Sequence, residues 1–403
     1  MNWQAGWLLS CLFLIAQPAE ALYSWDEAQS RGDARLLLRG FALASRKPSK
    51  PAVDQERDKQ ALGGLARIMA DSRYQQGWHV EFNAYQTYMS RSLVAEQGSL
   101  GTVLDVERSG LLEWSLSDTE YAQLAVDRLN AHWSAGRFDI RLGRQAINLA
   151  STFFFTPNDF FAPFASQAFY RVYKPGVDAI RSEIAVGDLG SLSVIAVQGY
   201  RQDSSTDSGW SDDAETSRNS YLTRYIANAM GFEWNLMAGK VRRTRVQGGA
   251  ISGELFGWLG LRAEGHRLEE IDKPGPSLSK YSIGLEHRWE NSFMLQIEQY
   301  YHGPGAVDVN EYVLDQAYPA RRYQAMGMSF EFTPLMLGQL SVVHNQIDSS
   351  RLYNLNAVYS LSNESELSID LSLPEGQTPA GSVIRSEFGA YPRILNIEIR
   401  AYF

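Results

Sequence analysis

The residue types that carry out chemistry are few and dispersed in this chain. The histidines are His79, His132, His266, His287, His302 and His344, and they show no His-Glu-x-x-His spacing of the kind that holds zinc on a helix. The single cysteine, Cys11, lies near the start of the chain. These residues form no recognisable catalytic motif. We therefore expect no catalytic residues, no metal ligands and no cofactor.

Charged residues form two groups that could bind ions. Four cations lie close together at Lys240, Arg242, Arg243 and Arg245, where they would attract anionic solutes or bind lipopolysaccharide phosphates, and we favour the second. An acidic group, Asp203, Asp207, Asp212, Asp213 and Glu215, would hold divalent cations only weakly, and a solvated loop explains it better. The formal net charge of −9 argues against a nucleic-acid partner.

A third group is aromatic. Residues 148–176 contain Phe153, Phe154, Phe155, Phe160, Phe161, Phe164 and Phe169, seven of the 18 phenylalanines in the chain. An exposed loop should not display so much apolar surface, so these rings need a place away from bulk water. Where they go depends on the elements around them.

The beginning of the chain is typical of an exported protein. An apolar run from Trp7 to Ala16 precedes Ala19-Glu20-Ala21, a small-x-small tripeptide of the kind that signal peptidase cuts, although no Lys or Arg precedes the run. We predict a signal peptide over 1–21 and a single domain over 22–403. An uncleaved anchor and lipidation at Cys11 are the alternatives. No later stretch is apolar enough for a membrane helix.

Most of the chain after residue 60 alternates between apolar and polar residues in segments of about ten, which predicts strands with one apolar face. We expect strands at 33–45, 63–75, 78–90, 119–133, 137–147, 177–187, 191–201, 220–233, 236–245, 249–257, 259–270, 279–289, 292–302, 321–332, 336–346, 351–361, 365–373 and 392–403. The fold class is therefore all-β, an antiparallel barrel of about 18 strands, with 16 as the alternative. The 220–257 region could be divided differently.

The connections favour a transmembrane barrel over a soluble sandwich. Very short turns alternate with mostly longer polar connections (91–118, 148–176, 202–219, 303–320 and 374–391), as in outer-membrane barrels with short periplasmic turns. Five tryptophans, Trp78, Trp133, Trp234, Trp258 and Trp289, lie beside the short turns, where they would form an interfacial girdle.

The final strand carries a targeting signal. Leu395, Ile397, Ile399, Ala401 and Phe403 alternate with polar residues, and this pattern is similar to the signature by which the barrel-assembly machinery of Gram-negative bacteria recognises its substrates. We expect Ile399, Ala401 and Phe403 to act as the assembly signal. The expected location is the Gram-negative outer membrane, in contact with its lipids and lipopolysaccharide.

One motif suggests a family. Arg141-Leu142-Gly143-Arg144-Gln145 followed by Thr156-Pro157-Asn158-Asp159-Phe160-Phe161-Ala162-Pro163 resembles a Gly-Arg-Gln strand and a Pro-x-Asp-x-Phe-x-Pro loop of porin-like outer-membrane barrels, including relatives of the alginate-export family. The resemblance implies a passive channel. It carries over no alginate site, because no matching sugar-binding residues are present.

A barrel provides a place for the phenylalanines. Pro157 and Pro163 make 156–164 a poor strand, and irregular backbone cannot face hydrocarbon. We expect 148–176 to fold inward as a constriction or plug, with Arg141, Arg144, Asp159, Phe160, Phe161 and Arg171 around the narrowest passage. The alternative is packing on the outer rim or against a partner subunit.

We therefore predict a porin-like channel for passive diffusion of small solutes. One alternative is a non-catalytic sheath for a periplasmic electron-transfer or export partner. Another is a barrel enzyme: Asp212-Asp213 with His266 could mimic an omptin protease, whereas His344 near Ser349-Ser350 does not match outer-membrane phospholipases. The sequence does not specify the solute, the ion selectivity, an open or plugged state, or whether the protein is a homo-oligomer.

Overall fold

The computed structural model describes residues 22–48, 58–90, 106–117, 121–169, 171–206, 208–272, 275–313, 317–381 and 383–403. The signal peptide predicted for residues 1–21 lies outside these ranges and stays a prediction. Within the described ranges, no helix has the length and apolar character needed to cross a membrane.

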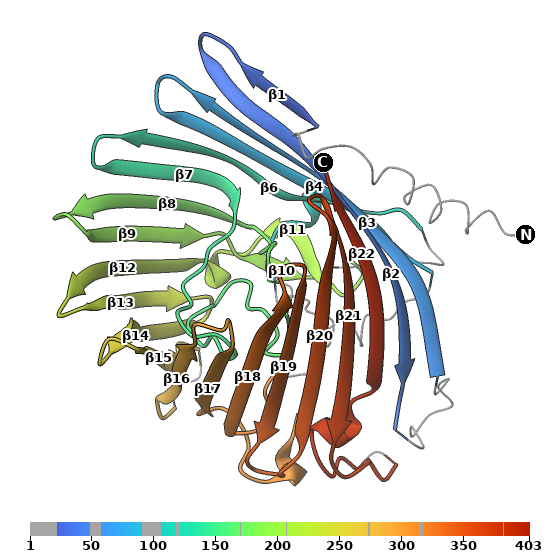
Figure 1. Ribbon diagram of the computed structural model, residues 1–403. Helices are drawn as coiled ribbons and strands as arrows, with labels where there is room; N and C mark the ends of the chain where they lie inside the picture. Colours follow the sequence, from blue (N-terminus) through green and yellow to red (C-terminus); the bar gives the residue numbers. More distant parts are fainter. Residues whose placement is uncertain are drawn as a thin grey trace, which may run out of the picture.

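The described residues form a closed antiparallel β-barrel of 18 strands (Figure 1). The wall consists of β2 (Ser30–Arg46), β3 (Asp58–Tyr74), β4 (Trp78–Met89), β6 (Tyr121–Ala135), β7 (Phe138–Gln145), β8 (Val177–Val186), β9 (Gly190–Val197), β12 (Ser220–Ala229), β13 (Phe232–Val241), β14 (Thr244–Leu255), β15 (Leu259–Glu270), β16 (Leu278–Arg288), β17 (Met294–His302), β18 (Arg322–Thr333), β19 (Met336–Asn345), β20 (Arg351–Ser362), β21 (Ser365–Glu375) and β22 (Arg393–Tyr402).

Shorter elements are added to this wall. β1 (Tyr23–Asp26) pairs with the start of β2, β5 (Glu113–Ser115) pairs with β6, and β10 (Tyr200–Gln202) pairs with β11 (Trp210–Ala214) as a separate hairpin. Single 3₁₀ turns are η2 (Gly110–Leu112), η3 (Thr216–Arg218), η4 (Val309–Glu311) and η5 (Phe388–Ala390). These four 3₁₀ turns lie in connections at the end of the barrel with the longer loops.

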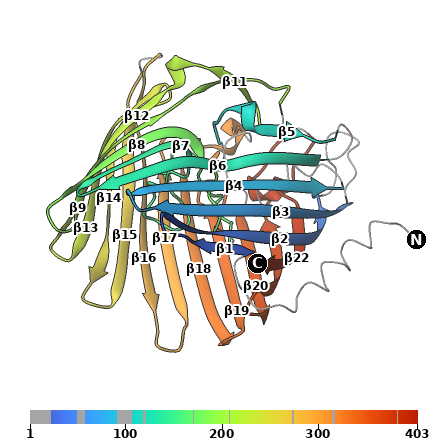
Figure 2. The same ribbon diagram turned by 90° about the horizontal axis from the view of Figure 1, so that it is seen from above.

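The barrel closes where its last strand meets its first. β22 lies antiparallel to β2, from Leu37 opposite Tyr402 to Arg46 opposite Arg393 (Figure 2). Phe403 continues this pairing by exchanging two backbone hydrogen bonds of 2.8 Å with Leu36. The residues proposed as an assembly signal therefore lie at the seam of the barrel.

The two faces of the strands differ as the alternation predicts. On β22, Leu395 and Ile397 are exposed on the outside, at 40% and 43%, while Asn396, Glu398 and Arg400 are buried toward the interior. Closing the sheet removes free edges, so every strand can satisfy its backbone hydrogen bonds in an apolar medium. The wall thus has an apolar exterior and a polar lumen.

Each of the eighteen expected strands corresponds to an observed one, and the alternative of 16 strands is wrong. The expected boundaries within 220–257 are also wrong, because the turns fall at residues 230–231 and 242–243. Met230 and Arg242 have positive φ angles of 56° and 51°, a turn conformation that sequence rules assign to Asn or Gly. Arg242–Arg243 is also a two-residue turn at the end with the longer loops, so the segregation of loops by length is only partial.

Candidate functional site

The Phe-rich connection between β7 and β8 folds into the barrel (Figure 1). Glu298 on β17, whose neighbour Ile297 is exposed on the outer face, points into the lumen and accepts hydrogen bonds from three consecutive amides of this connection. The donors are the backbone N–H groups of Phe153, Phe154 and Phe155, at 2.9, 3.0 and 2.6 Å. We call residues 146–176 the long inner segment.

A second buried carboxylate, two strands away in the wall, holds the same segment. Glu264 on β15 accepts hydrogen bonds from the backbone N–H groups of Ser151, Thr152 and Asn158, the last two at 3.0 Å. The Asn158 side chain then donates to the carbonyl of Gly249 at 2.9 Å. Pro157 and Pro163 leave this stretch without a regular ladder, so the wall carboxylates satisfy amides that would otherwise lack partners.

The phenylalanine rings pack against lumen aromatics rather than solvent. Phe155 is fully buried and stacks on Tyr300 of β17, with ring centroids 4.8 Å apart. It also touches Tyr318 and Tyr323, at 5.5 and 5.8 Å. Phe388 of the last long loop belongs to the same buried cluster. Apolar burial thus reinforces the carboxylate anchors and draws another loop inward.

Asp159 and Lys174 form a buried ion pair inside the long inner segment. Their side chains are only 3% and 9% exposed and contact each other directly. Burial raises the pKa of the Asp159 carboxyl and lowers the pKa of the Lys174 ammonium, because both charges lose hydration. The pair joins the two halves of the segment.

Arg171 also holds separate parts of the long inner segment together. Its guanidinium donates to the backbone carbonyls of Phe153, Ala165, Ser166 and Ala168 and stacks over the Phe153 ring at 4.8 Å. Phe153 is 40% exposed and Val172 is 61% exposed, whereas Phe161 is buried. The surface that the long inner segment leaves uncovered therefore includes Phe153 and Val172.

A second connection also turns against the inner wall, and the sequence did not indicate it. We call residues 106–115 the short inner segment. β7 is only eight residues long and leaves the outer part of β6 unpaired, and β5 takes that place. Covering an open strand edge in this way removes unpaired backbone groups.

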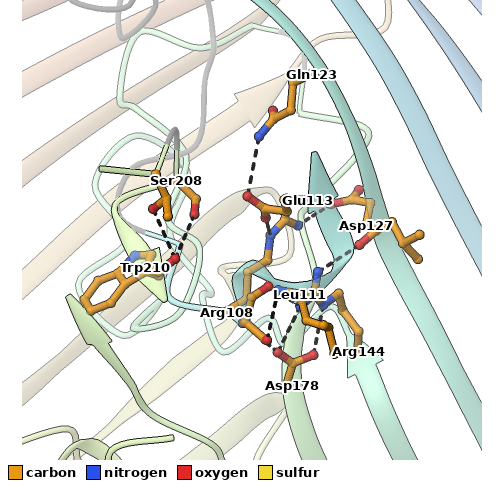
Figure 3. Close-up of polar contacts among 12 residues, drawn as sticks. Arg108, Leu111, Glu113, Gln123, Asp127, Arg144, Asp178, Ser208 and Trp210 are labelled. Carbon is orange, nitrogen blue, oxygen red and sulfur yellow. Dashed lines mark hydrogen bonds and ion pairs between the residues drawn. The ribbon is translucent and has the colours of Figure 1, made fainter. Parts of the chain in front are cut away.

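Charged side chains hold the short inner segment (Figure 3). Asp127 on β6, 1% exposed, accepts from Arg67 of β3 at 2.7 Å and from Arg108 at 2.8 Å. Glu107 accepts from Arg218 and Arg242, each at 2.8 Å. The short inner segment is therefore joined to the wall through Asp127, and to the η3 connection and the β13–β14 turn through Glu107.

The Gly143-Arg144-Gln145 motif supports the same region. Gly143 has a φ of 112°, and a Cβ atom there would come within 2.4 Å of the Leu129 carbonyl oxygen, so only glycine fits. Arg144 follows, 2% exposed, and donates to Asp178 at 2.9 Å and to the carbonyl of Ser109 at 2.8 Å. Ser109 donates its own N–H to Asp178 at 2.9 Å.

The six residues predicted around a narrow passage are thus distributed over three places. Four of them belong to the long inner segment: Asp159, Phe160, Phe161 and Arg171. Arg144 lies on β7, just before this segment begins, and donates a hydrogen bond to Ser109 of the short inner segment. Arg141 lies elsewhere: it lines a cavity of about 720 Å³ near the short-turn end, together with His79 and His132. A role for these six in a constriction stays a prediction.

The basic group at residues 240–245 is largely paired with neighbouring loops. Besides the Arg242 contact with Glu107, Arg243 lies 2.8 Å from Glu215 and 3.5 Å from Asp272, and Lys240 donates to the Ser217 carbonyl at 2.9 Å. In the acidic group, Asp213 pairs with Arg201, and Asp207 lies outside the described residues. Both groups thus contribute to packing among the outer loops.

One cluster brings together residue types of a hydrolytic triad. Ser134 and Asp139 both contact the same nitrogen of His132, Nε2. A triad needs the acid on one ring nitrogen and the nucleophile on the other, so this arrangement cannot relay a proton. Among the described residues, no group of three or more His, Cys, Asp or Glu is placed to hold a metal ion.

Comparison with protein-family models found no match, and comparison with curated proteins found none either. Solved structures do share the fold. OccAB3 of Acinetobacter baumannii aligns at TM-score 0.59 and 11% identity, covering 92% of this chain and 99% of that one. OccK8 (OprE) of Pseudomonas aeruginosa aligns at 0.57 and 8%, covering 92% and 98%. OpdL of Pseudomonas aeruginosa aligns at 0.58 and 11%, covering 92% and 98%.

These structures extend over nearly the whole chain, so the likeness is one of complete architecture. None of the three is named as an alginate-export protein, and the comparisons do not support that part of the sequence resemblance. By its fold, this chain is a porin-like β-barrel similar to the Occ structures.

Proposed function

We propose that this protein is an outer-membrane channel through which small solutes diffuse passively. A closed barrel with an apolar exterior and a polar lumen is suited to spanning a bilayer by strands. The likeness to the Occ structures over 92% of the chain supports the same assignment. The channel needs no catalytic step, and the end with the short turns faces the periplasm.

Selectivity in this proposal arises where the two inner segments narrow the lumen. The observation that carries it is the capture of six backbone amides of 151–158 by Glu264 and Glu298, which fixes irregular chain inside the barrel. A solute would pass the uncovered Phe153 and Val172, with Arg171 beside them. Asp159 and Arg144 act by holding the segments, because both side chains are buried in ion pairs.

Export and assembly complete the proposal. The signal peptide is cut after Ala21, and the assembly machinery recognises the final strand through Ile399, Ala401 and Phe403. The pairing of Phe403 with Leu36 supports this, because the recognised strand is the one that must close the barrel. Lipopolysaccharide surrounds the outer rim. Deleting Phe403 should lower the outer-membrane level of the protein, and an unchanged level would contradict its role.

Conductance across a planar bilayer tests the proposed function. Refolded protein that shows the heat-modifiable mobility of a folded barrel should give discrete current steps, and candidate solutes that enter should block them. Folded protein that produces no steps under these conditions would contradict a diffusion channel.

A further inference from the structure

Several short turns at the periplasmic end carry large apolar side chains at their tips. Met230 between β12 and β13 is 92% exposed, Phe256 between β14 and β15 is 84%, Leu189 between β8 and β9 is 73%, and Leu335 between β18 and β19 is 51%. Turns in water normally have polar residues or glycine at their tips. We call these four residues the apolar tips.

Two of the apolar tips occupy backbone conformations that disfavour them. Met230 and Phe256 have φ angles of 56° and 58°, and each precedes a glycine that also has positive φ. Asn, Asp and Gly adopt this region most easily, whereas bulky side chains are genuine outliers there. A bulky apolar residue that is both strained and exposed gives nothing to the fold of the isolated barrel. Its environment must supply the compensation.

The apolar tips occupy one sector of the rim, from β8 to β19. The turns of the remaining sector are polar: Glu27-Ala28-Gln29, Gln75-Gln76-Gly77, Gly136-Arg137 and Asn363-Glu364. Exposed aromatic residues flank the turns of both sectors, with Trp78 at 47%, Phe138 at 57% and Trp289 at 42%, so the sectors differ in the tips themselves. The β16–β17 turn, with Asn291-Ser292 at its tip, is the polar exception within the apolar sector. An uneven rim indicates that the two sectors meet different surroundings.

Strand length indicates what those surroundings are. The strands that flank the apolar tips are short: β8, β12, β13 and β19 have 10 residues, β9 has 8, and β14, β15 and β18 have 12. A tilted strand of about 9–11 residues crosses only the hydrocarbon core, so turns between such strands end at its border. Trp258, at the same tip as Phe256 and 55% exposed, is a residue type that prefers this border.

We propose that Leu189, Met230, Phe256 and Leu335 insert into the inner-leaflet interface of the membrane and anchor the β8–β19 sector there. The turns Ala229-Met230-Gly231-Phe232 and Leu255-Phe256-Gly257-Trp258 contain no charge, so they enter lipid without burying an ion. The polar turns of the opposite sector stay in the periplasm. This proposal rests on the barrel spanning a bilayer and is independent of conduction.

Site-directed labelling tests it directly. Cleavage after Ala21 would remove the only cysteine, so single cysteines can be introduced at Met230 and Phe256, with Gln76 and Asn363 as polar-turn controls. The barrels are refolded into phosphatidylethanolamine/phosphatidylglycerol vesicles and labelled with an environment-sensitive fluorophore. Labels at 230 and 256 should show blue-shifted emission and quenching by brominated lipid. Labels at 76 and 363 should be quenched by aqueous iodide.

Two results of this labelling experiment would contradict the lipid anchor. If folded, heat-modifiable barrels show aqueous quenching at all four positions, the lipid anchor is wrong. Protection at 230 and 256 that appears only in native outer membranes would instead assign the tips to a periplasmic protein, and would overturn the proposal as well.

A matched set of substitutions separates lipid contact from turn geometry. Met230→Asn and Phe256→Asn relieve the positive φ, so refolding in detergent micelles should equal or exceed that of the parent. Insertion into vesicles should be slower, with a lower final yield. Ser292→Asn, at a polar turn with φ of 68°, gives the same backbone relief without apolar loss and should insert like the parent. Parent-like insertion of the first two variants would contradict the proposal.

Discussion

The two inner segments enter the same lumen but are held by different forces. Buried carboxylates of the wall capture backbone amides of the long inner segment, and its rings pack into an aromatic cluster. The short inner segment is held by side-chain ion pairs, in which Asp127, Asp178 and Glu107 each accept from arginine. The first arrangement depends on apolar burial and the second on charge balance.

This difference has consequences for loss of a single group. Removing one partner of a buried ion pair leaves the other charge without compensation, which is costly, whereas a ring cluster loses contacts one at a time. We therefore expect the short inner segment to fail abruptly on single substitutions. The long inner segment should require removal of several residues, or of one wall carboxylate that serves several amides.

The largest effect should follow removal of the long inner segment. Replacing 153–164 by a short Gly/Ser linker deletes most of the rings, the three residues whose amides Glu298 holds, and Asn158, one of the three that Glu264 holds. The lumen should then widen, and single-channel conductance should rise clearly. Replacing the mostly exposed 378–381 in the same way is the control and should leave conductance unchanged. Parent-like conductance of a folded 153–164 variant would mean that this segment does not limit the passage.

Asp127→Asn should destabilise the barrel by about 3–5 kcal/mol, because Arg67 and Arg108 both lose a buried carboxylate. The short inner segment should then open, increasing current noise. Asp213→Asn is the matched control: its pair with Arg201 is 60–64% exposed, so the expected change is about 0–1 kcal/mol. Denaturant titration of the two variants checks the contrast, and equal losses would show that burial of the pair does not decide the cost.

Glu298→Gln should have a smaller effect, about 1.5–3 kcal/mol, because the amide keeps an acceptor oxygen but loses the charge that strengthens the bonds to Phe153, Phe154 and Phe155. Hydrogen exchange of these three amides should accelerate while the wall strands stay protected. Glu331→Gln, in an exposed pair with Arg288, is the control. Unchanged exchange at 153–155 would remove Glu298 as an anchor.

The sequence was sufficient for the barrel because alternation repeats along every strand and a slip by one residue would expose the polar face to lipid. It failed at Met230 and Arg242, where residues that seldom take positive φ form the turns. It indicated that 148–176 turns inward because phenylalanine must be buried somewhere. Composition alone could not show which strands receive the rings.

The short inner segment had no such signal. Residues 106–115 contain ordinary charged and apolar residues, and their partners Asp127, Asp178, Arg218 and Arg242 lie 19 to 135 residues away in the sequence. One local sign was present: the expected strand 137–147 contains Gly143 directly before a charged residue, and glycine within a strand often marks a bulge or a close backbone approach. The pairing of charges across the lumen is a property of the closed barrel and cannot be read from spacing.

Asp159→Asn distinguishes a charge that faces the pore from one that is buried in an ion pair, and its effect on conduction should be the smallest. A carboxylate lining the passage would attract cations, and its loss would shift the reversal potential toward anions. Because Asp159 is 5% exposed and paired with Lys174, we expect little change in the reversal potential.

The substitution instead affects stability, because Lys174 loses its partner while its pKa is already lowered by burial. A group whose folded pKa lies below its unfolded value destabilises most at low pH and is relieved as rising pH removes the proton. The variant should therefore recover stability as the pH rises toward about 10.5, the ordinary pKa of lysine. Asp159→Asn combined with Lys174→Met, which removes the titrating group, should lack this recovery. A large selectivity shift without pH-dependent recovery would place Asp159 in the passage after all.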